Sequence, residues 1–389
     1  MRKLPIALAV LGHAVIDACQ NVLPVILPLL LDRFHLSYAQ VGLAAALSSI
    51  SSSIIQPAFG WVSDRCSTRW FMPAGALWSG VMMALVGFAP RYWILLLLVI
   101  CNGIGTAAFH PVASIAVARA SASKRGLGMS FFSAAGNFGF AIGPVMGAAL
   151  LRAFDLQGTA VLLFPSMLMA VALYIWRDEF EERPKPAAPA AADGSPVPWG
   201  KVLTLCTLIT LRSWAYSGLI VFIPLLVHAQ GGGPEVTARA LFVFLFFGAL
   251  GGIVGGDLSD RLGRQPVIAV SLLAFPLLML AAVLLAGILH WLFLAVAGMA
   301  LLASFSVTVV FAQELLPRHL GLASGLSLGL AFGTGGVGVA LSGLLADALG
   351  LRISMAILMV LPGLAGGLAL LLAPPRSRIG WRRIGRALR

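Results

Sequence analysis

The sequence GWVSDR at residues 60–65 returns as GDLSDR at residues 256–261, an offset of 196 positions. Self-similarity at a fixed spacing indicates an internal duplication. Other residues repeat at the same offset without a gap: Pro28, Leu29 and Leu30 with Pro224, Leu225 and Leu226, Gly139 with Gly335, and Gly147 with Gly343. The chain is therefore predicted to consist of two related halves.

The composition places both halves in a membrane. Of the 389 residues, 60% are hydrophobic and only 10% are charged, with a mean hydropathy of +0.98. A soluble domain has about 25% charged residues. The net charge of +12 lies mainly in short segments between apolar runs and at the C-terminus, and no nucleic-acid-binding motif accompanies it. We expect anionic lipid headgroups of the inner leaflet, and not nucleic acid, to be the partner of these charges.

Twelve apolar runs are long enough to cross a bilayer, which takes about 20 helical residues. They cover residues 5–31, 38–62, 70–89, 93–118, 126–152, 159–176, 201–228, 237–258, 266–287, 291–313, 320–346 and 352–373. The predicted fold is all-α and integral to the membrane, with twelve transmembrane helices in two six-helix repeats. The predicted parts are an N-terminal bundle (1–176), a cytoplasmic linker (177–200), a C-terminal bundle (201–375) and a basic cytoplasmic tail (376–389).

The positions of the basic residues predict the orientation. Most of the 26 Lys and Arg residues fall on one side if both termini are cytoplasmic, as the positive-inside rule requires. An even number of spans separates the two copies, so they have the same orientation. Paired halves of this kind are a transporter plan with a substrate site between them at mid-membrane. We expect a multi-pass protein of a bacterial inner membrane that holds a complete pathway in one chain and works as a monomer.

The repeated loop motif resembles the loop signature of the major facilitator superfamily. A carboxylate there can pair with basic groups or a helix end in one conformational state only, so these residues are predicted to gate the pathway; positive-inside anchoring alone is the alternative. The first copy departs from the pattern, because Ser67 and Thr68 replace the expected Gly and basic residue. The candidate gating residues are Gly60, Asp64, Arg65 and Arg69 in the first copy and Gly256, Asp260, Arg261 and Arg264 in the second.

A glycine run in the fifth apolar stretch resembles the GxxxGPxxG pattern of exporters in the same superfamily. It consists of Gly139, Gly143, Pro144 and Gly147. Small residues four apart let two helices approach closely, and proline bends the backbone. We count these residues among the gating candidates, with plain helix packing as the alternative. The pattern favours export over uptake.

Five longer stretches make the resemblance more specific. The chain is similar to the fosmidomycin-resistance family of the major facilitator superfamily in GHAVIDACQNVLPVILPLLL (12–31), SIIQPAFGWVSDR (53–65), GTAAFHPVAS (105–114), SFFSAAGNFGFAIGP (130–144) and AQELLPRHLGLASGL (312–326). The resemblance implies a proton-driven exporter of small polar or drug-like molecules that needs no cofactor. Substrates vary within the group, so the namesake phosphonate is not assumed here.

The first apolar stretch carries an unusual polar stripe. His13, Asp17, Gln20 and Asn21 follow helical spacing on one face. A charged side chain at mid-bilayer costs about 2.5–3.5 kcal/mol on insertion scales and normally faces a cavity or a partner. Burial disfavours the charged Asp17 carboxylate, whereas a charged imidazole favours it. We predict a proton-coupling site formed by Asp17 and tuned by His13, with Gln20 and Asn21 binding substrate; a static pair that fixes helix packing is the alternative.

Arg212 is the counterpart of this stripe in the second half. At the offset of 196 it falls on Ile16, next to Asp17. It is predicted either to neutralise Asp17 until substrate or proton intervenes, or to bind an anionic substrate group bidentately. Tyr216 lies one helical turn further on and is predicted to contact the same ligand.

Further polar residues are assigned to the same pathway. Asn102, His110 and Asn137 lie inside apolar stretches and are predicted to bind substrate; for His110, satisfying a backbone carbonyl freed by Pro111 is the alternative. Glu314 closes the tenth run and is predicted either to couple protons at a cytoplasmic gate or to form a surface pair with Arg318.

The sequence lacks the motifs that mark several classes of enzymes and metal-binding proteins. The chain has no GxxxxGK[ST] phosphate loop, no GxSxG or HExxH motif, and no metal-type spacing of its four cysteines. We therefore predict no enzyme activity, no cofactor and no metal. The predicted function is proton-coupled antiport that exports a small polar, anionic or drug-like molecule by alternating access. A proton-coupled uptake symporter and a non-transporting membrane sensor or scaffold are the alternatives.

Overall fold

A computed structural model describes residues 2–63, 69–121, 125–180, 198–316 and 320–372. Within these ranges the chain is α-helical with two short 3-10 helices and no strand, which confirms the predicted all-α class. The candidate gating residues Asp64 and Arg65, most of the predicted linker and most of the basic tail lie outside the described residues.

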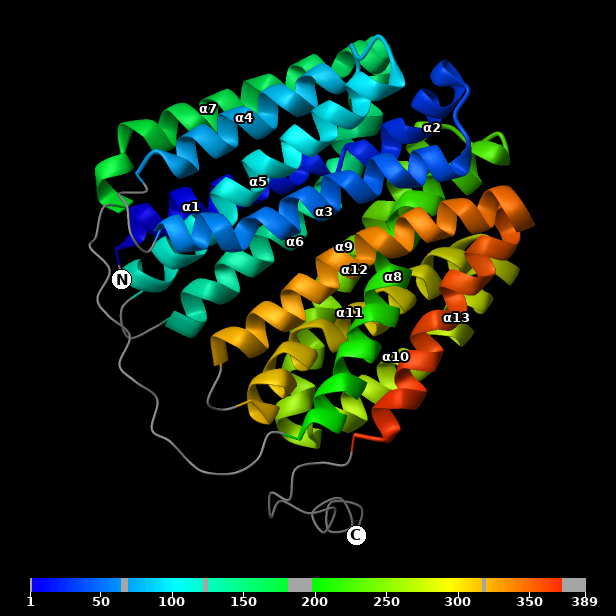
Figure 1. Ribbon diagram of the computed structural model, residues 1–389. Helices are drawn as coiled ribbons and strands as arrows, with labels where there is room; N and C mark the ends of the chain where they lie inside the picture. The colour runs from blue at the N-terminus through cyan, green and yellow to red at the C-terminus, as the bar shows by residue number, and fades with distance from the viewer. Residues whose placement is uncertain (1, 64–68, 122–124, 181–197, 317–319, 373–389) are drawn as a thin grey trace.

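The helices form two groups that follow the chain order (Figure 1). The first group contains α1 (Lys3–Gln20), α2 (Leu23–Phe34), α3 (Tyr38–Ser63), α4 (Phe71–Val86), α5 (Tyr92–Ala120), α6 (Arg125–Phe154), the 3-10 helix η2 (Asp155–Leu162), α7 (Leu163–Ile175) and the 3-10 helix η3 (Arg177–Phe180). The second contains α8 (Trp199–Ala229), α9 (Pro234–Leu262), α10 (Arg264–Leu284), α11 (Ile288–Leu315), α12 (Leu320–Leu349) and α13 (Leu351–Leu370).

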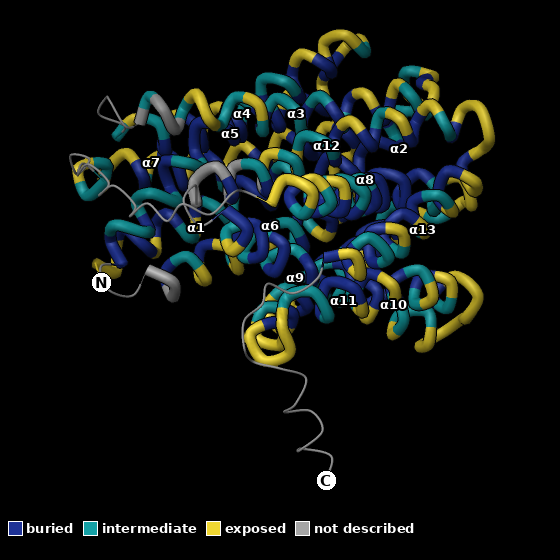
Figure 2. The backbone as a smooth tube through the Cα atoms, turned by 60° about the horizontal axis from the view of Figure 1, so that its bottom comes forward, coloured by how far each residue is buried: buried dark blue, intermediate teal, exposed yellow. Residues whose placement is uncertain are grey.

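The outer surface of both groups is apolar. Figure 2 shows the buried residues gathered where the helices meet, yet many exposed side chains are large and hydrophobic, such as Trp93, Phe164, Leu277 and Ile288. Among the described residues, 10 helical stretches are long and apolar enough to cross a membrane. Apolar side chains inside and outside are typical of a helix bundle whose solvent is lipid. The chain is a multi-pass membrane protein.

The first apolar stretch is broken into two helices. α1 ends at Gln20 and α2 begins at Leu23. Pro24 explains the break, because it has no backbone N–H and its ring clashes with the carbonyl four residues earlier, on Gln20. The Asn21 side chain then donates a hydrogen bond to the carbonyl of Phe140 on α6. The break therefore lies one turn beyond Asp17 and ties this part of the chain to α6.

The glycine run brings α6 against α1. A Cβ atom at Gly139 would lie 2.3 Å from the carbonyl oxygen of Ala14, and one at Gly143 would lie 2.6 Å from that of Ala18. Both carbonyls are backbone atoms of α1, so only glycine permits this distance. The close approach occurs inside the first group; the predicted role of the run in gating stays a prediction.

The two groups are joined at the end of the bundle where α3 begins. Asp347 of α12 accepts hydrogen bonds from the backbone N–H groups of Tyr38 (2.8 Å) and Ala39 (2.9 Å). These N–H groups have no partner within α3 because they belong to its first turn. Shortly before Tyr38 in the chain, the carboxylate of Asp32 at the end of α2 lies 2.8 Å from His228 at the end of α8. Charged contacts thus connect the groups here.

Replacing Asp347 should loosen this junction. We expect Asp347→Ala to raise hydrogen–deuterium exchange at the Tyr38 and Ala39 amides about 5- to 30-fold, because loss of a capping carboxylate costs about 1–2 kcal/mol. The measurement is exchange followed by mass spectrometry in lipid nanodiscs. Asp257→Ala is the matched control, since Asp257 pairs only with Arg261 on the same helix in the described structure. Unchanged exchange in Asp347→Ala would show that the carboxylate does not hold the groups together.

Candidate functional site

A buried carboxylate lies between two imidazoles inside the first group. Asp17 on α1 is only 3% exposed. Its Oδ2 atom lies 3.2 Å from Nε2 of His13, one turn earlier on α1, and its Oδ1 atom lies 3.1 Å from Nε2 of His110 on α5. We call these three residues the His–Asp–His cluster. The structure brings His110 to Asp17, a contact that spacing along the sequence does not reveal, and the predicted substrate role of His110 stays a prediction.

Backbone carbonyls fix the far side of both imidazoles. Nδ1 of His13 lies 2.8 Å from the carbonyl oxygen of Phe132 on α6, and Nδ1 of His110 lies 3.0 Å from that of Thr106 on its own helix. The His13 ring also stacks on the Phe132 ring, with centroids 4.0 Å apart. Each ring is therefore held on two sides, which orients both Nε2 atoms toward Asp17.

Gly136 of α6 leaves room for the cluster. A Cβ atom at this position would lie 2.4 Å from Cε1 of His13 and 2.9 Å from Oδ2 of Asp17. Gly136 precedes the predicted glycine run by one residue triplet and was not among the predicted site residues. Its signal in the sequence is its place three residues before Gly139, which puts both glycines on one face of the helix.

Arg212 is buried in the second group with neutral partners. It is 2% exposed, and its guanidinium donates to the hydroxyls of Thr308 and Ser213, each at 3.2 Å. The guanidinium carbon lies 4.7 Å from the centre of the Phe305 ring. Among the described residues, no carboxylate forms an ion pair with Arg212. A buried cation of this kind can receive an anion, since guanidinium groups bind carboxylates and phosphates bidentately.

Tyr216 lies one turn beyond Arg212 on α8. Its phenol lies within range of the charges of both Arg212 and Asp17. Charged or polar residues of α1, α5 and α8 are therefore near one another on the two sides of the boundary between the groups. The arrangement can bind and release protons on one side and hold an anion on the other.

The remaining predicted substrate residues have other surroundings. Asn102 donates to the backbone carbonyl and the hydroxyl of Ser79, at 3.0 and 2.9 Å, so its amide links α5 to α4. Asn21 is buried in its contact with α6, Gln20 is half-buried, and Asn137 is exposed beside Gly136. The contacts of Asn21 and Asn102 are those of helix packing, and the substrate roles of all four residues stay predictions.

The second copy of the loop motif forms an ion-pair network within the second group. Arg264 pairs with Asp260, lies 3.1 Å from a Glu314 oxygen through Nε, and donates to the hydroxyl of Ser259 at 2.7 Å. Arg261 pairs with Asp257 at 3.0 Å. Glu314 thus contacts Arg264, whereas its predicted alternative partner Arg318 lies outside the described residues.

Less of the first copy is described. Gly60 lies near the end of α3, and Arg69 lies 3.7 Å from a carboxylate oxygen of Asp178 beside α7. Gly256 lies in α9. The contacts connect helices within each group, and a gating role of either copy stays a prediction.

The His–Asp–His cluster also has the spacing of a metal site. The sequence predicted no metal, and in the part of the chain that the structure describes the His–Asp–His cluster is the one group of donor atoms, all within 4.8 Å of one another, that could hold an ion. Each donor atom already faces a hydrogen-bond partner, so the geometry requires no ion.

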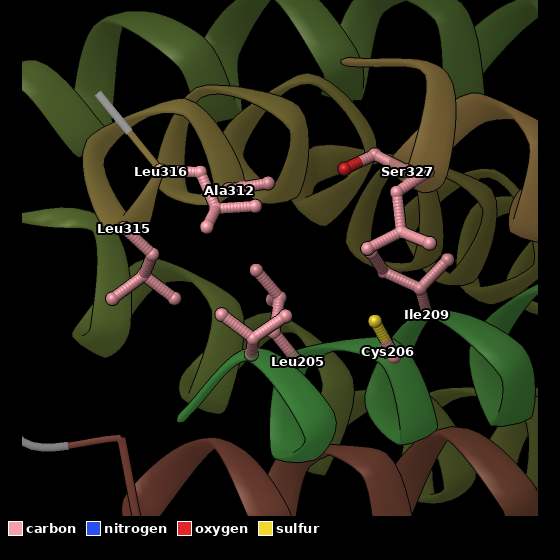
Figure 3. Close-up of a pocket in the computed structure, with 9 residues that line it drawn as sticks. Leu205, Cys206, Ile209, Ala312, Leu315, Leu316 and Ser327 are labelled. Atoms are coloured by element: carbon pink, nitrogen blue, oxygen red, sulfur yellow. The ribbon is translucent and has the colours of Figure 1, made fainter. Parts of the chain in front are cut away.

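A small apolar pocket between α8, α11 and α12 is lined mainly by aliphatic side chains, with the Cys206 sulfur and the Ser327 hydroxyl as polar atoms (Figure 3). It does not include Arg212 or the cluster.

Comparisons with known proteins agree on one family. The family model of the Major Facilitator Superfamily matches residues 9–327 and 205–387. The fosmidomycin resistance protein of Escherichia coli is 31% identical over 381 residues, covering 95% of this chain and 92% of that protein. The uncharacterised transporter YfnC of Bacillus subtilis is 33% identical over the same coverage.

Solved structures share the fold. A bacterial homologue of the human lysosomal transporter Spinster, in an inward-facing and unoccupied conformation, superposes with a TM-score of 0.80 at 17% identity, covering 95% of this chain and 96% of that one. The nucleoside transporter NupG superposes with a TM-score of 0.71 at 14% identity, covering 95% and 98% of the two chains.

Adding one methyl group at Gly136 should disturb the cluster. We expect Gly136→Ala to lower the free energy of unfolding by about 1–3 kcal/mol, because the new Cβ atom overlaps an imidazole that is held on two sides. Gly329→Ala is the matched control: no atom lies within 4 Å of its Cβ position, so better helix propensity should leave it neutral or up to about 1 kcal/mol more stable. Thermal unfolding in detergent measures both, and equal effects would contradict the close contact.

Proposed function

Because this chain belongs to the Major Facilitator Superfamily, we propose that it is a proton-coupled antiporter that exports a small polar, anionic or drug-like molecule. The family predicted from the sequence is confirmed by the family match and by the relatives. Members of this family are membrane transporters of small molecules and not enzymes. The fosmidomycin resistance protein among the relatives makes a phosphonate the first substrate to test.

The proposed architecture has twelve crossings in two six-helix repeats. Of the 10 membrane-length stretches, the one over Gly128–Ile175 contains both α6 and α7, and the shorter apolar helix Phe71–Val86 adds one more crossing. The offset of 196 residues between the loop motifs supports the duplication. With both termini in the cytoplasm of a bacterium, the end where α3 begins faces outward. The contacts of Asp347 and His228 then join the two groups at the outer side.

The observation that carries the proposal is the presence of a titratable cluster in the first group and a buried cation in the second, with Tyr216 within range of the charges of both. The His–Asp–His cluster can bind and release protons, and Arg212 has no carboxylate partner among the described residues. In the proposed cycle the cluster takes protons from outside, which weakens its attraction for Arg212. Arg212 is then free to exchange partners, and substrate leaves the cell as protons enter.

The first test removes the carboxylate of the cluster. Proteoliposomes containing a pH dye are given fosmidomycin, other phosphonates, amphipathic drugs or small metal chelators. We expect wild type to move protons against the substrate gradient, and Asp17→Asn to reduce this flux at least about tenfold, because an interaction of 1.4 kcal/mol or more is lost. Glu235→Gln, at the exposed start of α9, is the matched control for loss of one carboxylate.

The direction and size of the proton flux separate the alternatives. Proton movement in the same direction as the substrate would indicate an uptake symporter. Full flux in Asp17→Asn would make Asp17 structural. If one of the compounds binds but none causes proton movement in wild type or Asp17→Asn, the result would favour a sensor.

The second test concerns the anion site. We expect Arg212→Lys to weaken binding of the transported phosphonate about 10- to 100-fold, because a point charge replaces a bidentate donor and a charge-assisted hydrogen bond contributes about 1.5–3 kcal/mol. Arg239→Lys is the matched control, since Arg239 also lies over an aromatic ring, 5.6 Å from the centre of Trp291, but at the start of α9. Isothermal titration calorimetry in detergent measures the affinity. Equal affinities for wild type and Arg212→Lys would remove Arg212 from the site.

A further inference from the structure

We propose that His110 is a second proton-carrying residue and that the fully loaded His–Asp–His cluster holds two exchangeable protons. The inference rests on the hydrogen-bond geometry of the cluster and deepens the proposed function, because it gives the number of protons that the coupling site can bind. The sequence alone suggests one proton on Asp17, tuned by His13.

The backbone partners determine where each neutral imidazole carries its hydrogen. Nδ1 of His13 lies 2.8 Å from the Phe132 carbonyl oxygen, and Nδ1 of His110 lies 3.0 Å from the Thr106 carbonyl oxygen. A carbonyl oxygen only accepts hydrogen bonds, so both Nδ1 atoms must bear hydrogen. A neutral imidazole has one N–H group. Without a further proton, each Nε2 atom therefore presents a lone pair.

The contacts on the other side of the rings require protons. The two Nε2 atoms lie 3.2 and 3.1 Å from different oxygens of the Asp17 carboxylate. A lone pair and a carboxylate oxygen repel each other unless a proton lies between them. Two such contacts take two protons, one on each imidazole Nε2 atom. The number of bound protons is therefore a property of the whole His–Asp–His cluster and not of a single residue.

The proton count sets the charge of the cluster. With both protons bound the net charge is plus one; with one it is zero, and with none it is minus one. A site that used Asp17 alone would change only between zero and minus one. The cluster therefore reverses its sign, attracting a nearby cation when empty and repelling it when loaded.

The groups that face the cluster from the neighbouring helices are few. On α5 the facing titratable group is His110 itself, and on α6 the facing residues are Phe132 and Gly136. α4 contains no ionisable residue, and on α7 the nearby polar contact is that of Ser166 with the Cys19 thiol. From the second group, Tyr216 on α8 reaches the Asp17 charge and also that of Arg212. Loading two protons thus reverses the charge that the cluster presents to the second group at Tyr216.

The experiment is nuclear magnetic resonance of the full chain labelled with ¹⁵N-histidine, in lipid nanodiscs after treatment with EDTA. His13→Gln and His110→Gln assign the signals. We expect both residues to be imidazolium at acidic pH, and both to lose the Nε2 hydrogen and keep the Nδ1 hydrogen at alkaline pH. The number of protons that the cluster releases between acidic and alkaline pH should fall from about two in wild type to about one in His110→Gln.

Two controls keep the result interpretable. Asp32→Asn should change the His228 signals and leave those of His13 and His110 in place, because Asp32 faces His228 only. Asp17→Asn keeps both carbonyl partners, so both neutral rings should still carry hydrogen on Nδ1, even if the cluster rearranges. A neutral ring with its hydrogen on Nε2, or a change in only one of the two rings over the pH range, would overturn the inference.

The result is independent of transport, because no substrate is present. Two exchangeable protons together with no proton-driven transport would support the inference and remove the proposed function. One exchangeable proton together with transport that depends on Asp17 would do the reverse.

Discussion

A carboxylate inside an apolar bundle must be surrounded by hydrogen-bond donors, since an unpaired charge there costs several kcal/mol. Asp17 meets this requirement with two imidazoles from different helices. Much of the first group is arranged around that need. α6 approaches α1 closely enough for Phe132 to hold the His13 ring only because Gly136 and Gly139 have no side chain. The cluster and the glycine run therefore form one structural unit.

Neighbouring residues on one helix could be predicted from the sequence, whereas contacts between helices could not. His13 and Asp17 are four residues apart, so helical periodicity alone places them on the same face. His110 is 93 positions from Asp17, and only the packing of α5 on α1 brings them into contact. Asn102 has the same appearance in the sequence as His110, a polar residue in an apolar run, but its amide faces Ser79 on α4. Polarity alone does not show which face of a buried helix meets a neighbour.

The two groups use charge differently although their loop motifs repeat. The first holds three ionisable residues inside, in the His–Asp–His cluster, and has ion pairs at its helix ends, such as that of Arg69 with Asp178. Among the described residues, the second holds one buried cation, Arg212, and has ion pairs at its helix ends, where Arg264 joins Asp260 and Glu314. At the repeat offset, Arg212 corresponds to Ile16. The buried charges of the two groups are thus complementary and not identical.

The pair of Asp32 and His228 has a geometric meaning beyond its charge. These residues are 196 positions apart, the same offset as the two loop motifs. In the proposed architecture a pseudo-twofold axis along the membrane normal relates the two halves. Two residues related by this axis can be in contact only if both lie close to it. The contact between Asp32 and His228 therefore marks the point where the axis reaches the end of the bundle. In a symmetric assembly of two identical halves, each residue here would meet its own copy, and two aspartates would repel each other. In the proposed duplication, the single chain carries an acid at one of these two positions and a base at the other.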